Sequence, residues 1–239
     1  AHKASWDGQR KKLAAAAETF RRCGVDCIVE LGDRIKEASR EDDADMMRGI
    51  RAALLEAGIP AYHLFGNHDV IYLPKQEQNE LLDKQGDYEM VVRSGCRLIL
   101  LDSTEGVSGG PISQEQLTWL QQAIEEASPS ETVLVFCHHL LDVPDVTGHS
   151  YFESRPREAA AANAEEVRGI LARTGRVAAV FHGHLHRWQE SRWDGIPYVT
   201  LPSFTDDEDK RFPSGGFAIV EVPPAPGPVT WQLLPAPDV

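Results

Sequence analysis

The sequence has few positive charges and no long hydrophobic run. It carries 24 lysines and arginines against 37 aspartates and glutamates, a formal net charge of −13. An acidic surface repels the phosphates of nucleic-acid polymers and of anionic membranes. No apolar run reaches the roughly 20 residues that a membrane-spanning helix needs. We therefore expect neither a nucleic-acid polymer nor a membrane as partner. An anionic substrate would need positive charge supplied locally, for example by bound cations.

Cysteine is also scarce, and its spacing matches no metal or redox motif. The chain has four cysteines, none in a Cys-x-x-Cys pair: Cys23, Cys27, Cys96 and Cys137. Reduced, buried thiols of a cytosolic protein are the expected state. No signal peptide is visible, so we expect a cytoplasmic location. The chain begins at Ala1 without a methionine, however, so a lost upstream leader remains an alternative.

The sequence also has no internal repeats. Its composition, 42% hydrophobic and 26% charged, is typical of a globular protein. We therefore expect one domain over residues 1–239. Helical patterns are expected at 6–23, 41–57 and 74–85, after a Ser113–Gln116 capping box, and after a cap at Asn163. Strand patterns are expected at 27–31, 61–65, 88–92, 97–101, 132–137, 177–181, 188–193, 197–201, 216–222 and 229–233. We predict an α/β fold, a four-layer α/β/β/α sandwich of two mixed β-sheets with flanking helices.

Polar motifs follow four of the predicted strands, where open α/β folds place their sites. They are Gly32-Asp33, Gly66-Asn67-His68-Asp69, His138-His139 and Gly183-His184-Leu185-His186. Taken singly, an Asp after a Gly is often a turn or cap residue, and a lone His is more often structural than a ligand. Four strand ends that each deliver a ligand type favour one metal site. His184 and His186 are two apart, so in an extended segment they point to the same face.

The mixture of donor atoms indicates which metals fit. Imidazole nitrogens with carboxylate and amide oxygens suit Mn, Fe, Zn, Ni or Co better than Ca or Mg alone. Two such ions, about 3.5–4 Å apart, clamp a phosphoryl group and generate a hydroxide at neutral pH. They would also supply the positive charge that this acidic chain lacks.

The order of these motifs resembles the calcineurin-like metallophosphoesterases, four of whose five sequence blocks are present between Asp33 and His186. The resemblance implies two divalent or trivalent metal ions, Mn, Fe or Zn. It also implies that Asp33 bridges the two ions, and that Asn67, His138, His184 and His186 complete the ligand set. His139, the second histidine of its pair, is implied to be replaceable.

The same resemblance gives His68 a catalytic role. It corresponds to a histidine that orients the phosphate or protonates the leaving alkoxide, paired with the acidic Asp69. His68 and Asn67 are then the expected substrate contacts. Arg155, in the irregular stretch 140–162, is a further candidate for binding phosphate. The alternative for Arg155 is a solvated loop charge.

The family's first block, Asp-x-His at the end of the first strand, is not found in this sequence. We expect that strand to lie upstream of Ala1. An alternative is that His2 is the histidine of this block. If the block is absent from the working protein, one metal would be poorly held.

The resemblance predicts a dinuclear metal-dependent hydrolase of phosphate esters, in which a hydroxide formed at the metals attacks phosphorus. Stretches such as Phe181-His182-Gly183 look similar to manganese-dependent ADP-ribose/CDP-alcohol diphosphatases. The implied substrates are small phosphorylated molecules, phosphodiesters or nucleoside-diphosphate-linked compounds. The alternative is a metal-binding or scaffold protein with a degenerate, inactive site. The sequence does not indicate an oligomeric state.

Overall fold

The computed structural model describes residues 6–35, 37–105, 109–205, 209, 215–224 and 227–237. Its main element is a six-stranded mixed sheet in the order β3-β4-β5-β6-β8-β7. The strands are β3 (Glu89–Arg93), β4 (Cys96–Leu101), β5 (Thr132–Cys137), β6 (Val177–His182), β8 (Ile196–Thr200) and β7 (Gln189–Trp193). β4, β5, β6 and β8 are parallel, and antiparallel β3 and β7 form the edges. The α/β class with a large mixed sheet is therefore confirmed.

The remaining strands form two separate ladders. β1 (Ile28–Glu30) pairs in parallel with β2 (Ala61–His63), and β9 (Gly216–Glu221) pairs antiparallel with β10 (Thr230–Pro235). The sequence predicts one second mixed sheet in a four-layer sandwich, and this arrangement stays a prediction. Within the described part of the chain, no ladder hydrogen bonds join the β1–β2 pair to the β9–β10 pair, so each remains a two-stranded unit.

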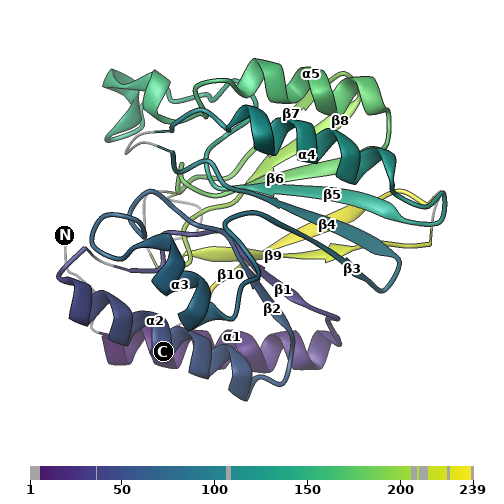
Figure 1. The fold of residues 1–239 in the computed structure, drawn as a ribbon. Helices are drawn as coiled ribbons and strands as arrows, with labels where there is room; N and C mark the ends of the chain where they lie inside the picture. The colour runs from purple at the N-terminus through teal and green to yellow at the C-terminus, as the bar shows by residue number, and fades with distance from the viewer. Residues whose placement is uncertain are drawn as a thin grey trace.

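The helices occur where the sequence predicts them, with ends shifted by a few residues. They are α1 (Trp6–Cys23), α2 (Arg40–Glu56), α3 (Lys75–Leu82), α4 (Gln114–Glu125) and α5 (Ala164–Thr174). In Figure 1, α4 and α5 cover one side of the large sheet, and α1 and α2 lie on the opposite side of the molecule, beyond β1, β2, β9 and β10. None of the helices in the described ranges has the length and hydropathy of a bilayer-crossing segment.

Two predicted helix caps differ from the expectation. Ser113 accepts a hydrogen bond from the Gln116 backbone N–H, as a capping residue should. The Gln116 side chain does not complete the box, because it bonds the backbone of Asp102 instead. Asn163 precedes α5 without a side-chain cap bond, because its amide is engaged with the backbone of Ile112. Both side chains connect the end of β4 and its following loop to the helices.

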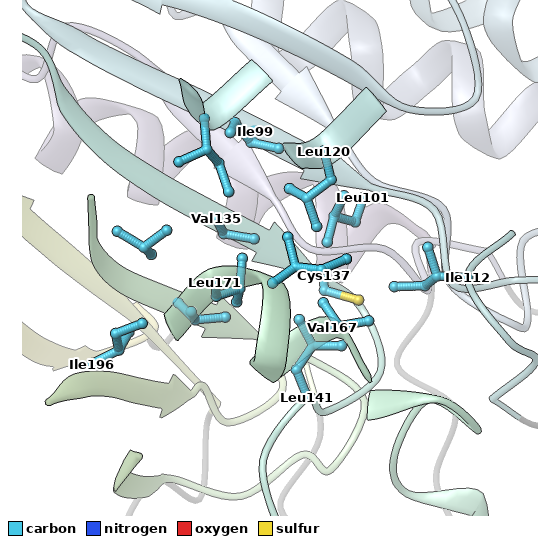
Figure 2. Packing of buried hydrophobic residues seen from close by; sticks show 14 of the residues in the cluster. Ile99, Leu101, Ile112, Leu120, Val135, Cys137, Leu141, Val167, Leu171 and Ile196 are labelled. Carbon is cyan, nitrogen blue, oxygen red and sulfur yellow. The ribbon is translucent and has the colours of Figure 1, made fainter. Parts of the chain in front are cut away.

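Each face of the large sheet has its own apolar core. On the face toward α4 and α5, the cluster includes Ile99, Leu101, Val135, Leu120 and Leu171, drawn in Figure 2. On the other face, alternate residues of the same strands pack toward β1, β2, β9 and β10; among them are Leu98, Leu100, Phe136 and Phe181. This alternation follows from the two-residue period of a strand. The parallel pairing of β4, β5 and β6 brings their carboxyl ends to one edge.

Replacing Leu120 by Ala should destabilise the protein by about 2–5 kcal/mol, because the side chain is fully buried between α4 and the sheet. Urea unfolding followed by circular dichroism measures this loss. Leu55→Ala is the matched control, since Leu55 is 63% exposed on α2. Equal losses for the two variants would contradict the assigned core.

Candidate metal centre

Four of the five predicted metal ligands meet at one point. His138, directly after β5, lies at the centre: its Nε2 is 3.1 Å from Asp33 Oδ2, 3.2 Å from Asn67 Oδ1 and 3.2 Å from His184 Nδ1. Asp33 follows β1, Asn67 follows β2 and His184 follows β6. Strand ends that lie far apart in sequence therefore place their polar atoms within a few ångströms.

The outer nitrogens of the two histidines show which atoms face the centre. His138 Nδ1 lies 2.7 Å from the carbonyl oxygen of Leu31, and His184 Nε2 lies 2.9 Å from that of Glu158. A carbonyl only accepts hydrogen bonds, so each of these nitrogens carries the proton. The inner nitrogens, His138 Nε2 and His184 Nδ1, face each other at 3.2 Å. Such backbone bonds are the usual support of metal-binding histidines.

The centre thus consists of oxygen and nitrogen atoms of metal-ligand type that face one another. Asp33 Oδ2 is buried and has no hydrogen-bond partner within the described residues. With it come the amide oxygen of Asn67 and the two ring nitrogens. A buried acceptor without a donor, such as Asp33 Oδ2, is costly, and a cation among these four atoms would satisfy it. The residues therefore fit the metal ions that the sequence predicts, with the mixed nitrogen and oxygen donors of transition metals.

The electrostatics favour the metal-binding forms of Asp33 and His184, whereas the pKa of His138, which burial would lower, is raised by the carboxylate of Asp33. Burial alone would raise the pKa of Asp33, but the neighbouring histidines, His138 foremost, hold it below its ordinary value. Burial, together with the charge of His138, lowers the pKa of His184 to about 3. Asp33 is therefore ionised and His184 neutral at physiological pH. A carboxylate and a neutral imidazole are the states that a metal requires.

His186, the fifth predicted ligand, lines the same cavity as Asp33, His138 and His184. This cavity has a volume of about 330 Å³ and continues past β1 toward α1 and α2. His184 and His186 adopt φ values of 62° and 55°, in the left-handed region. The segment after β6 is therefore turned rather than extended, unlike the simple strand geometry assumed from sequence.

His139 lies beside the centre but has no free lone pair for a metal. Ring nitrogens of His138, His139 and His184 lie within 4.8 Å of one another. However, His139 Nε2 accepts from the backbone N–H of Gly109 at 3.1 Å, and its Nδ1 bonds Ser103 Oγ at 2.8 Å. Burial lowers the pKa of His139 well below its ordinary value, which keeps the ring neutral. His139 is therefore a buried structural residue.

Asp69 has a different set of partners from the predicted pairing with His68. It is fully buried, and its carboxylate accepts from the backbone N–H groups of Gly66, Asp33 and Arg34 at 2.8–3.0 Å. Arg34 Nη1 lies 3.3 Å from Asp69 and Arg34 also pairs with Glu30. Asp69 therefore positions the loop that carries Asp33. The sequence alone could not reveal these partners, because Arg34 and Glu30 resemble ordinary surface charges.

His68 lies at the exposed rim of the centre. Its backbone N–H donates to Asp33 Oδ1 at 2.9 Å, and its ring Nε2 lies 4.0 Å from Asp33 Oδ2. Its Nδ1 contacts the carboxylate of Glu37. The ring therefore faces the predicted metal site from the solvent side. Sequence reasoning missed Glu37, which lies in a loop without a motif.

Arg155 does not line this cavity. It lies between the short 3₁₀ helices η1 (Phe152–Ser154) and η2 (Pro156–Glu158), exposed, with its guanidinium 4.5 Å from the ring centroid of Tyr151. The predicted phosphate contact of Arg155 stays a prediction. His2 lies outside the described residues, so its role is likewise still a prediction.

Replacing Gly66 by Ala should lower the metal content of the purified protein. A Cβ at Gly66 would lie 2.0 Å from Asp33 Oδ1 and 2.3 Å from the Asp33 backbone nitrogen, so the two loops would have to separate. Elemental analysis after metal reconstitution measures the effect. Gly86→Ala is the control, because its nearest neighbour would be a carbonyl at 3.4 Å. Full metal content in the Gly66 variant would show that the close approach of the loops is unnecessary.

Comparison with known families gives one match over most of the chain. The sequence profile described as "Calcineurin-like phosphoesterase" matches residues 2–188. Two relatives are 3',5'-cyclic adenosine monophosphate phosphodiesterases named CpdA. The one from Haemophilus influenzae is 26% identical, over 74% of this chain and 61% of the relative. The one from Escherichia coli (strain K12) is 29% identical, over 74% of this chain and 60% of the relative. A probable glycerophosphodiester phosphodiesterase GpdQ of Arcobacter nitrofigilis is 29% identical over 61% of this chain and 52% of the relative. The chain thus spans about 60% of the length of the CpdA relatives.

Solved structures agree on the fold. A dimetal phosphatase from Danio rerio superposes with a TM-score of 0.71 at 17% identity, over 94% of this chain and 88% of that one. TT1561 of Thermus thermophilus superposes with a TM-score of 0.59 at 11% identity, over 96% and 95%. At these identities the likeness concerns the fold alone.

Proposed function

The chain belongs to the calcineurin-like phosphoesterase family, and from this premise we propose that it is a metal-dependent phosphodiesterase acting on small phosphodiesters. The observation that carries the proposal is the convergence of Asp33 Oδ2, Asn67 Oδ1, His138 Nε2 and His184 Nδ1, a mixed oxygen and nitrogen donor set of the kind that binds a transition metal. His186, in the same cavity, is proposed as a further ligand of a two-metal site.

The names of the relatives support the substrate class. Two are cyclic AMP phosphodiesterases and one is a probable glycerophosphodiester phosphodiesterase, so diesters of small alcohols or nucleosides are favoured. Nucleoside-diphosphate-linked substrates remain the second choice, on the resemblance already described. When bound, the metal ions would activate water and neutralise phosphate charge. That neutralisation matters in a protein with a net charge of −13.

The residues of the chain have separable tasks in this proposal. Asp33, Asn67, His138, His184 and His186 hold the metals. Asp69 positions the Asp33 loop through three backbone hydrogen bonds. His68, whose Nε2 faces Asp33 from the open side, gives a proton to the oxygen of the departing alcohol.

Protein freed of metal and reconstituted with Mn²⁺ should hydrolyse bis(p-nitrophenyl) phosphate, and a panel of diesters should identify the natural class. The panel contains cyclic AMP, glycerophosphodiesters and ADP-ribose, with p-nitrophenyl phosphate as the monoester control. Chelator-treated protein should be inactive. If no divalent metal produces turnover although metal binds, the inactive scaffold becomes the better interpretation.

Changing Asn67 to Ala should reduce bound metal, because the amide oxygen is one of the converging acceptors. Asn79→Ala is the control, since the amide of Asn79 lies half-buried on α3 and bonds the carboxylate of Asp87 instead. Elemental analysis compares the two. An unchanged metal content in the Asn67 variant would remove that residue from the ligand set.

Changing His68 to Ala should leave the metal content intact and lower kcat by roughly 100- to 10,000-fold, the usual range for a lost general acid. Steady-state kinetics on the best diester, with metal analysis of the same samples, measures both quantities. Loss of metal together with activity would instead make His68 a ligand.

A further inference from the structure

Two large apolar side chains are exposed side by side in the sequence next to the metal centre. Ile71 is 40% exposed and Tyr72 is 50% exposed, and both lie in the turns that follow Asn67. The other exposed large apolar side chains of the described ranges are separate from one another: Leu55, Val92, Val143, Tyr151 and Trp193. Single exposed apolar residues are ordinary on a protein surface, whereas contiguous apolar surface often marks a binding site.

A buried amide fixes the loop that carries this pair. Gln78, on α3 and fully buried, donates from its Nε2 to the carbonyl oxygens of Asp69 and Leu73, each at 2.8 Å. The three residues between those carbonyls, 70–72, therefore form a loop whose two ends are held by one side chain. Leu73 is itself fully buried, which anchors the second end. Because the loop is held in place before any ligand arrives, binding to its exposed side chains costs little ordering entropy.

The same loop is tied to the metal centre. Asp69 begins it, and the Asp69 carboxylate accepts from the backbone N–H of Asp33 at 2.8 Å. His68, one residue earlier, faces Asp33 Oδ2 from the solvent side. Tyr72 follows His68 by four residues, so their Cα atoms lie within about 14 Å of each other even for a fully extended chain. A group attached to a phosphate at the metal centre is therefore within reach of the apolar pair.

The chemistry of the pair suits a flat, unsaturated ring. It combines the aromatic ring of Tyr72 with the branched aliphatic side chain of Ile71. Aromatic side chains bind nucleic acid bases by stacking, and every base has a face on which a ring can stack. A glycerol group is small, polar and without a ring, so it would gain little from this surface. The pair therefore favours the nucleoside over the glycerol type of phosphodiester.

We propose that Ile71 and Tyr72 form the binding surface for the base of a nucleoside-containing phosphodiester, and this inference rests on the proposed phosphodiesterase function. The metal centre binds the phosphate, and the ring of Tyr72 stacks on the base. Ile71 supplies a further apolar contact. The two residues thus determine specificity among small phosphodiesters, and they take no part in the bond-breaking step.

Two phosphate monoesters test the surface without turnover. AMP and ribose 5-phosphate share the sugar and the phosphate, and only AMP has a base. Calorimetry on Mn²⁺-loaded protein should show AMP binding at least about fivefold more tightly, the gain expected from stacking one base. Tyr72→Ala should abolish this preference through a weaker Kd for AMP, and Tyr72→Phe should retain it. Equal affinities of the two compounds for the wild-type protein would overturn the proposal.

Exposed apolar residues elsewhere on the surface provide matched controls. Trp193→Ala, on β7, is the control for Tyr72→Ala, and Val92→Ala, on β3, is the control for Ile71→Ala. Both control variants should keep the AMP preference of the wild type, whereas Ile71→Ala should reduce it. A loss of preference in the Trp193 variant as large as in the Tyr72 variant would contradict the inference. Loss of bound metal in Tyr72→Ala would also contradict it, because Tyr72 would then support the centre rather than the base.

Steady-state kinetics connect the surface to the proposed reaction. Tyr72→Ala should raise KM for cyclic AMP at least about fivefold, and KM for glycerophosphoglycerol by less than about twofold. Equal rises with both substrates would contradict the inference. Diester turnover by a wild-type protein that binds AMP and ribose 5-phosphate equally would refute the base-binding surface and leave the phosphodiesterase function intact. A Tyr72-dependent preference for AMP without any turnover would support the surface and count against the phosphodiesterase function.

Discussion

The carboxylate of Asp69 joins the two loops on which the metal centre depends. It accepts backbone hydrogen bonds from Asp33 and Arg34 after β1, and from Gly66 after β2. The Arg34 guanidinium balances its charge. Breaking such a buried pair by removing one partner typically costs about 3–5 kcal/mol. Because Gly66 allows the loops to touch, this one side chain sets the distance between the carboxylate of Asp33 and the amide of Asn67.

Unfavourable backbone conformations at the centre explain why the hydrogen bonds of Asp69 are needed. Asp33, His184 and His186 all have positive φ, each with a cost that ordinary loops avoid. Asp33 Oδ2 and His184 Nδ1 also crowd around His138 Nε2 in a buried site. These unfavourable terms are offset by the cores on both faces of the sheet and by the bonds of His138 and His184 to backbone carbonyls. The fold therefore holds a geometry that the isolated segments would not adopt.

The sequence predicts the centre well because strand ends follow local rules. Continuous apolar runs identify β4, β5 and β6, and parallel strands bring their ends to one edge, so His138 and His184 could be placed together in advance. The partners of Asp69, Gln116 and Asn163 could not be predicted, because each bonds backbone atoms distant in sequence. Glu37 was missed because its partner, the ring of His68, lies far from it in sequence. The division of the second sheet depends on pairing between strands far apart in the chain, which local patterns do not determine.

A cation would change the balance of this centre rather than merely occupy it. Asp69 and Arg34 hold the loops after β1 and β2 in the compact arrangement in which Asp33 Oδ2 is buried without a hydrogen-bond partner among the described residues. A bound cation would add attraction between the same loops, and anything that binds only the folded state stabilises it. Metal affinity and folding stability are therefore coupled through the β1 and β2 loops. The buried ion pair of Asp69 and Arg34 holds the site in place. The exposed rim around His68 remains available for the substrate.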